Sequence, residues 1–276
     1  LNADLSSAEI FLLKACELQP HNADNNFSLA LCYLSMEDLE STLKWLDSAL
    51  MIDPNYVAAE VYKAFVYFLQ GKMRKGWEQY EKRLQLEAFK GLNYGRPRWD
   101  GSKLKKETIL LLREQGLGDN IQFIRYAKKI VKKGGTVVVS TRKELETLFK
   151  SLDGVSLVTS GIPEPKHFYR YCPLMSLPYV FKTDQKSIPS TTPYLFPEKN
   201  LVNVWSHKLK KYSGLRVGLT WRGNRSFTND RFRSSSLKEV SELLSLKNIT
   251  FFSLMVDLLE EEQLPKNIVN LGKDFS

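Results

Sequence analysis

Two stretches of the sequence place charged side chains beside glycines in a way that could support chemistry. The first is REQGLGD, residues 113–119, which follows an apolar run and leads through Gly116 and Gly118 to Asp119. The two glycines permit positive φ angles and let a ligand approach the backbone. The carboxylate could act as a general base that removes a proton from a hydroxyl group. It could also be the N-cap of the following helix, a role that Asp fills very often, so both interpretations stay open.

The second stretch is WRGNRSFTNDRFRSSS, residues 221–236, which joins a predicted strand to a predicted helix. Guanidinium groups and a helix N-terminus both favour phosphate oxygens, so a diphosphate is the expected ligand of this loop. The alternative is a basic loop that is simply solvated, and the sequence does not separate the two. The candidate side chains for diphosphate binding are Arg222, Asn224, Arg225, Arg231 and Arg233.

The first stretch must be positioned by the strands and helices around it. Short apolar or β-branched runs alternate with amphipathic segments, which predicts a parallel sheet with helices on both faces. The expected strands are 108–112, 136–140 and 155–160, and the expected helices are 120–133 and about 143–151. In an open parallel sheet, ligands bind outside the carboxyl ends of the strands, where this stretch begins.

The alternation weakens between residues 161 and 213, where proline and aromatic residues dominate, and a bridging helix is predicted at about 199–211. It then resumes with expected strands at 216–221, 250–255 and 268–272, and with a helix at 236–246 that Ser235 or Ser236 caps. Two such runs predict two Rossmann-like lobes that face each other across a cleft. Because three strands make a thin sheet, we expect the second lobe to be incomplete.

The first ninety residues contain an internal repeat with a period of 34 residues. This shift aligns Pro20 with Pro54, Ala30 with Ala64, and Tyr33 with Tyr67. Small residues at a helix crossing, with an aromatic residue three positions later, resemble the tetratricopeptide repeat (TPR). Such repeats bury their faces against one another, so we expect further repeats upstream of a chain that starts in the middle of one.

The aromatic residues of these repeats are expected to pack in the core. Trp77, Tyr80 and Leu84 lie on one helix face at the spacing of a buried stripe. We also expect Tyr67 to pack in the core and not to contact a ligand. The concave groove of the repeat array is expected to bind a protein or peptide partner.

Charge is unevenly distributed along the chain, whose net charge is +9. Residues 1–90 carry 9 Lys or Arg and 13 Asp or Glu, whereas the remainder carries 31 and 18. A basic region can bind nucleic acid, an anionic membrane or a phosphate-bearing small molecule, and charge alone does not choose among them. No run of about 18 apolar residues occurs, which argues against a transmembrane helix.

The cysteines and histidines give no disulfide framework and no metal-ligand cluster. The three cysteines, Cys16, Cys32 and Cys172, have no CxxC spacing, and only three histidines are present. We therefore expect a reducing, cytoplasmic setting and no metal or cofactor. The chain begins at Leu1 without Met or a signal-peptide pattern, so we expect it to be an internal piece of a longer protein.

These patterns predict α-helical TPR repeats followed by α/β Rossmann-like lobes, with the second lobe incomplete. A linker is expected where Gly, Pro and Lys are frequent and no period is visible. The predicted boundaries are 1–90 for the repeats, 91–107 for the linker, 108–198 for the first lobe, and 199–276 for the bridging helix and partial second lobe.

The two loops, taken with their flanking strands and helices, resemble the glycosyltransferase region of GT-B type that follows TPR arrays in bacterial proteins. That region is related to the heptosyltransferase family and, more distantly, to O-GlcNAc transferase. The stretches GWEQYEKR (76–83) and PRWDG (97–101) are also similar to that group, so the resemblance covers nearly the whole chain. The pairing of GLGD with NDRFRS is its most specific part.

The resemblance implies an inverting glycosyltransferase that uses a nucleotide-diphosphate sugar as its donor substrate. In heptosyltransferases the Asp of the matching turn is regarded as the general base, which implies that role for Asp119. Gly116, Gly118 and Asn120 are implied to contact substrate, together with the arginine-rich loop. Helix N-termini favour an ionised carboxylate, which a base requires.

Two departures from the family bear on activity. The relatives continue past the position of Ser276 with a second nucleotide-binding segment that this chain lacks, and Met255 stands where many relatives have Gln. We therefore expect the activity to belong to the full-length protein. The main alternative is a TPR interaction scaffold whose GT-B part is catalytically silent. A nucleic-acid-binding protein is a third possibility that the charge allows, although no RNA or DNA motif is present.

Overall fold

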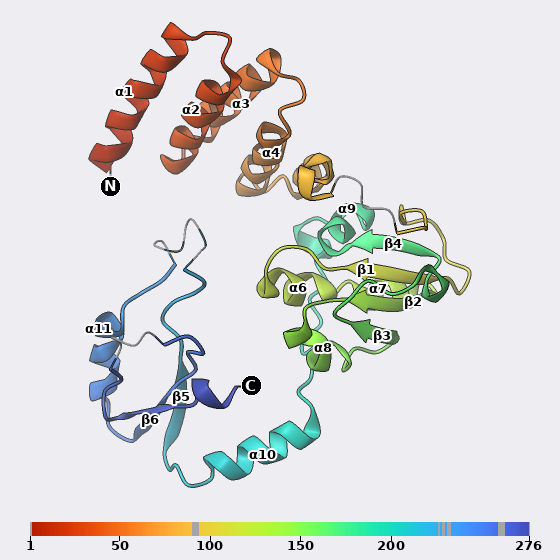
Figure 1. Cartoon of the computed structure of the whole chain (residues 1–276), viewed down its shortest axis with the longest axis vertical. Coiled ribbons are helices and arrows are strands. Elements are labelled where there is room, and N and C mark those ends of the chain that lie inside the picture. The colour runs from red at the N-terminus through yellow and green to blue at the C-terminus, as the bar shows by residue number, and fades with distance from the viewer. Residues whose placement is uncertain are drawn as a thin grey trace. The chain divides into compact units, whose positions relative to one another are not determined.

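A computed structural model describes residues 2–89, 94–225, 227, 230, 233–258 and 263–275. The chain forms two compact units, Leu1–Phe196 and Pro197–Ser276. Most of the helices and strands of both units are labelled in Figure 1.

The first unit begins with TPR-type helices that pack in pairs, as the repeat predicted (Figure 1). Asn22 caps α2 through its side chain, and Asp38 caps α3 in the same way. These short polar side chains satisfy backbone N–H groups that the first helical turn leaves unpaired. The helices are α1 (Asn2–Leu18), α2 (Ala23–Ser35), α3 (Leu39–Ile52), α4 (Val57–Leu69) and α5 (Met73–Tyr80), followed by 3₁₀ turns at Glu81–Gln85 and Glu87–Phe89.

Small residues let these helices approach closely. Ala30 and Ala64, which the repeat aligns, are both fully buried. Gly76 of α5 lies against the ring of Phe68, so that a Cβ atom there would come within 2.4 Å of a ring carbon. Tyr67 and Tyr80 are buried, which confirms the prediction that they pack in the core.

The same unit continues into a four-stranded parallel sheet with the order β3-β2-β1-β4. Three of its strands were predicted, but β4 was not. The strands are β1 (Thr108–Leu112), β2 (Thr136–Ser140), β3 (Val155–Thr159) and β4 (Arg170–Pro173). The helices are α6 (Leu117–Ile124), α7 (Ala127–Lys132), α8 (Lys143–Phe149) and α9 (Leu177–Val180), and 3₁₀ turns lie at Pro165–His167, Leu174–Ser176 and Gln185–Ser187.

The single helix predicted over 120–133 is divided into α6 and α7 at Arg125 and Tyr126. Both residues have tertiary partners at this break. Arg125 stacks on Tyr194, with 4.7 Å between its Cζ and the ring centroid. The Tyr126 hydroxyl donates a hydrogen bond of 3.1 Å to the hydroxyl of Thr183. The partners in these contacts lie about 60 residues further along the sequence. The periodicity of the helix itself therefore could not predict the break.

The two faces of the sheet carry different cores. Alternate strand residues such as Ile109 and Val137 join a large cluster that also contains core residues of α6, α7, α8, α9 and the last repeat. The opposite face carries a small cluster around Leu110, with Tyr94 and Tyr171 packed against it. We predicted helices on both faces of the sheet. The helical residues that pack in these two clusters all belong to the large cluster, on one face.

The segment predicted as a linker packs against the sheet over part of its length. Trp99 is fully buried in the large cluster, and its indole N–H donates to the carbonyl of Ser102 at 3.1 Å. Arg98 forms an isolated parallel bridge with Tyr171 of β4. The first lobe and the repeats therefore share one continuous core.

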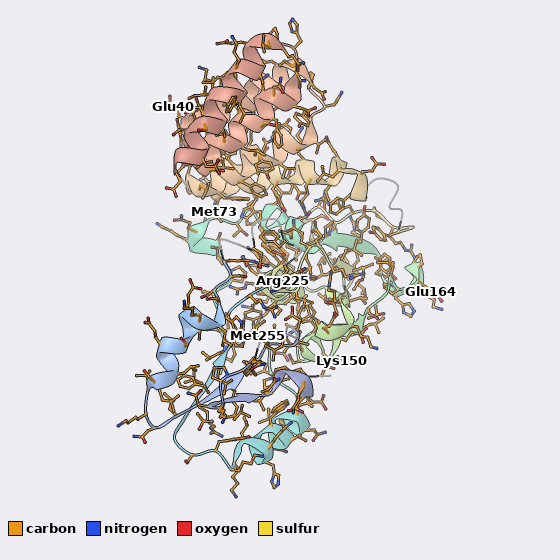
Figure 2. The ribbon with its side chains drawn as sticks, turned by 60° about the vertical axis from the view of Figure 1, so that its left-hand side comes forward. Glu40, Met73, Lys150, Glu164, Arg225 and Met255 are labelled. Carbon is orange, nitrogen blue, oxygen red and sulfur yellow. The ribbon has the colours of Figure 1, made fainter. Side chains whose placement is uncertain are left out.

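The second unit contains a three-stranded parallel sheet with the order β5-β6-β7. Among the described residues, Arg225 is exposed and Met255 is buried, and both are labelled in Figure 2. The elements are α10 (Lys199–Leu209), β5 (Leu215–Leu219), α11 (Leu237–Val240), β6 (Ile249–Ser253) and β7 (Ile268–Asn270), with 3₁₀ turns at Ser241–Ser245 and Gly272–Asp274.

Candidate functional site

The loop after β1 places Asp119 in the first turn of α6. Gly116 is the N-cap of this helix, with extended backbone at φ −82° and ψ 172°, and Asp119 is its third residue. The Asp119 carboxylate accepts a hydrogen bond of 2.9 Å from the N–H of Gly116. The residue therefore caps the helix from inside the first turn, and the prediction that it occupies the N-cap position was wrong because the helix starts earlier, at Leu117.

The predicted role of the glycines as positive-φ residues was also wrong. Gly116 has a negative φ and Gly118 lies within α6, whereas Gln115 is the residue of this loop with a left-handed φ, +50°. A non-glycine residue in this region is strained and must be held by its surroundings. Gly118 keeps the ligand-access interpretation open, since a Cβ atom there would meet no other atom within 4 Å.

Asn120 fastens this loop to the start of α6. Its side chain is 1% exposed, and its Nδ2 donates to the carbonyls of Glu114 at 2.8 Å and Gly116 at 2.6 Å. Its Oδ1 is buried and accepts no hydrogen bond from the residues that the structure describes. The amide nitrogen is thus used within the protein and the oxygen is buried, so the contact of Asn120 with substrate stays a prediction.

Glu114, which sequence reasoning did not select, anchors the loop to the last repeat. The Arg83 guanidinium donates two hydrogen bonds to the Glu114 carboxylate, from Nε to Oε2 at 2.8 Å and from Nη2 to Oε1 at 2.9 Å. Both side chains are 2% exposed, and Glu114 Oε1 also accepts from the N–H of Met175 at 2.8 Å. Burial opposes the charge on Arg83, but the bonds and attraction of Glu114 and Glu81 outweigh it and raise the pKa of Arg83.

A second contact joins the same two parts of the unit. Gln115 Nε2 donates to the hydroxyl of Tyr80 at 2.6 Å, and Arg83 lies over the Tyr80 ring at 4.7 Å from its centroid. The strained Gln115 is therefore held by a side chain of α5. A carboxylate two residues after a buried strand needs a partner, and this was the one sequence signal that could have pointed to Glu114.

Two arginines of the second predicted loop have ion-pair partners within the unit Pro197–Ser276. Arg222 Nη1 lies 3.2 Å from Asp257 Oδ2, and Arg233 Nε lies 3.1 Å from Asp230 Oδ1. Arg225 is exposed and forms no ion pair with a described residue. Asn224 is exposed too, whereas Arg231 lies outside the described residues.

The helix N-terminus expected to attract a phosphate is occupied by a carboxylate. Ser236 caps α11, as one of the two predicted alternatives stated, and its own N–H donates to Glu239 at 2.6 Å. Hydrogen bonds from Ser235 and Ser236 lower the pKa of Glu239, so this carboxylate stays ionised at neutral pH. A diphosphate at this point would have to compete with it.

The two predicted halves of the site belong to different units. Asp119 lies in Leu1–Phe196 and the arginine-rich loop in Pro197–Ser276, and each carries its own contacts. Within the described parts of the chain, no group of three or more His, Cys, Asp or Glu side chains could hold a metal ion. No helix of the described residues is long and apolar enough to cross a membrane.

Comparison with known families supports the assignment of the helical region. Residues 2–83 match the model of the family described as anaphase-promoting complex, cyclosome, subunit 3. The chain is also 40% identical over 60 residues to human tetratricopeptide repeat protein 17, which covers 21% of this chain and 5% of that protein. The N-terminal helices are therefore TPR-type repeats.

One curated relative is similar along nearly the whole chain. Protein FlbA of Caulobacter vibrioides is 24% identical over 285 residues, which covers 94% of this chain and 48% of FlbA. The chain thus spans about half the length of this relative.

Similar solved structures include two proteins of different kinds. The crystal structure of MamA is 22% identical, with a TM-score of 0.29, over 30% of this chain and 48% of MamA. A mutant O-GlcNAc transferase of Thermobaculum terrenum is 12% identical, with a TM-score of 0.29, over 49% of this chain and 34% of the transferase.

Proposed function

We propose that this chain is part of an inverting glycosyltransferase that takes a nucleotide-diphosphate sugar as donor. The observation that carries the proposal is the loop after β1, where an exposed turn brings a carboxylate to the carboxyl edge of a parallel sheet. This is the edge at which such sheets bind ligands. Asp119 is only half-buried, so an acceptor hydroxyl can reach it.

The proposed reaction uses Asp119 as the general base. Its carboxylate takes the proton of an acceptor hydroxyl while the hydroxyl oxygen attacks the anomeric carbon of the sugar. The bond from that carbon to the diphosphate oxygen breaks at the same time, which inverts the configuration. The electron pair leaves with the diphosphate, and the arginines of the second loop, Arg225 first among them, stabilise the negative charge that develops.

The TPR-type repeats are proposed to recruit the acceptor, a protein or a glycan. The support is the joint core of the repeats and the first lobe, together with the Arg83–Glu114 pair, which joins the repeats to the loop that leads to the proposed base. An acceptor held by the repeats would be delivered to a loop that the repeats themselves hold in place. We also place this protein in the cytoplasm, a proposal supported by three cysteines that are all free.

The second candidate function is a TPR scaffold with a silent glycosyltransferase region. The observations that favour it are the carboxylate partners of Arg222 and Arg233, and Glu239 at the start of α11. These contacts leave less positive charge for a diphosphate than the composition of the loop suggests.

A thermal-shift screen of the full-length protein against UDP-, GDP- and ADP-sugars distinguishes the two. A donor present at about a hundred times its dissociation constant adds about 2.7 kcal/mol of stability, which raises the midpoint by several degrees. The matched nucleoside monophosphates serve as controls for weak binding of the base alone. If none of the sugar nucleotides raises the midpoint, the scaffold function replaces the enzyme.

A further inference from the structure

A cavity of about 470 Å³ lies in the first unit where β1 and β4 end. Leu112 and Pro173 come from the ends of these two strands. From β1 the sheet continues on one side to β2 and β3, whereas β4 lies on the other side, so the strand order reverses here. Such a reversal is where open parallel sheets bind ligands, and the volume is that of a small-molecule pocket.

This cavity is separate from the residues selected by sequence. Gly116, Gly118, Asp119 and Asn120 do not line it, although the neighbouring Gln115 does. Part of its wall comes from the end of the helical region, through Leu84 and Phe89. The repeats and the sheet thus enclose it together, and the buried pair Arg83–Glu114 fastens these two walls to each other.

The charged lining of the cavity is mainly cationic. Arg113 is exposed, and its side chain forms no ion pair with any described residue. Arg98 also lines the cavity, and its Nε is buried without a hydrogen-bond acceptor among the described residues, although Glu81 accepts from its Nη2. Glu114 is the acidic residue of the lining, and Arg83 neutralises it. The unpaired guanidinium of Arg113 and the exposed part of the Arg98 side chain, 32% of its surface, favour a phosphate or carboxylate, whereas the buried Nε of Arg98 is closed to a ligand.

The remaining lining offers aromatic surface. The rings of Tyr94 and Tyr171 lie with their centroids 4.7 Å apart and tilted by 57°, and Phe89 adds a third ring to the lining. Burial raises the pKa of Tyr94, so its phenol stays neutral and able to donate a hydrogen bond at physiological pH. Tilted rings of this kind pack against flat aromatic groups and against the apolar faces of sugar rings.

We propose that this cavity binds an anionic group carried on a six-membered ring, such as a phosphate ester of an aromatic or sugar ring. Arg113 and Arg98 would hold the anion, and Tyr94 and Tyr171 would contact the ring. The site lies beside the loop of the proposed base but does not depend on the proposed transfer reaction.

Isothermal titration calorimetry of the protein with three probes tests this assignment. The probes are phenyl phosphate, glucose 6-phosphate and inorganic phosphate. We expect one of the two ring esters to bind at least roughly tenfold more tightly than inorganic phosphate, because only the esters reach the tyrosines. The ester that binds more tightly shows whether the site prefers an aromatic ring or a sugar ring. If neither ester binds, or all three probes bind equally, the proposal is wrong.

Substitutions at the cavity locate the site. Arg113→Gln should weaken the better ester roughly tenfold to a hundredfold, since it removes a charged hydrogen bond. Arg142→Gln is the matched control, an exposed arginine at the N-cap of α8 that does not line the cavity. Tyr94→Leu should weaken the ester but not inorganic phosphate, and Tyr169→Leu, at a tyrosine outside the lining that is 60% exposed, should change neither. Equal losses in a variant and its control would overturn the assignment.

Discussion

At the scale of single residues, the proposed base is held by local bonds and its loop by distant ones. Asp119 accepts a hydrogen bond from Gly116, three residues earlier in the chain. Glu114, in contrast, is gripped by Arg83 from 31 residues away. The first contact depends on spacing that the sequence shows directly. The second could not be predicted, because no period relates a residue of the repeats to one at the end of a strand.

The Arg83–Glu114 pair should be essential for the stability of the first unit. Arg83→Met leaves Glu114 buried without its cation, which should cost about 3–5 kcal/mol of unfolding free energy. Arg83→Met combined with Glu114→Leu should cost less than the sum of the two single changes, because no charge then remains buried. Urea unfolding of the four proteins in this cycle measures the coupling.

The matched control is the pair of Arg74 with Asp184, whose side chains are 66% and 38% exposed. Arg74→Met removes the same kind of charge from the same helical region and should cost no more than about 1 kcal/mol. Equal stability of the Arg83→Met and Arg74→Met proteins would contradict the account of the buried pair.

At the scale of elements, the repeats and the sheet form one folded body. Their common core contains Ala64 and Tyr80 from the helices and Ile109 from β1. Close approach of α4 and α5 brings Tyr80 into this core, and Gly76 makes that approach possible. The packing of the two helices should therefore influence the loop that carries Asp119.

Gly76→Ala tests this close approach. The new methyl group would meet the ring of Phe68 at 2.4 Å, which should cost about 1–3 kcal/mol through overpacking. The better helix propensity of alanine offsets up to about 1 kcal/mol of this loss. Gly118→Ala is the control, because the added Cβ at that helical position meets no atom within 4 Å. Urea midpoints that fall equally in the two variants, or in neither, would contradict the packing described here.

The elements could be predicted where local pattern decides them. The β-branched and apolar runs of β1, β2 and β3 indicated strands correctly, and the 34-residue period indicated the repeats. β4 was missed because Arg170 and Pro173 interrupt its apolar character, and pairing with β1 is what makes it a strand. The break between α6 and α7 was missed for a similar reason. Arg125 lies at this break, and its partners Pro189 and Tyr194 are distant in the sequence.

At the scale of the whole molecule, the chain consists of two units that contain different parts of the predicted site. The first, Leu1–Phe196, contains the TPR-type repeats and the proposed base, and the second, Pro197–Ser276, contains the arginine-rich loop. The uneven charge could be read from composition, with 9 basic and 13 acidic residues in positions 1–90 and 31 and 18 in the rest, but its boundary at residue 90 falls inside the first unit. The ion pairs Arg222–Asp257 and Arg233–Asp230 could not be predicted in the same way, since composition does not show which charges are already paired.

The proposed function requires Asp119 to act in the chemical step and not in donor binding. The most direct measurement compares the full-length protein with its Asp119→Asn variant, by the release of nucleoside diphosphate from sugar nucleotides and by calorimetric titration of the same donor. Asparagine can still accept the bond from Gly116, so the fold should be kept. We expect unchanged donor affinity and turnover reduced by roughly 10²–10⁴-fold, as the loss of a general base predicts. Turnover that survives in the asparagine variant would mean that Asp119 only caps α6 and would contradict the proposed mechanism.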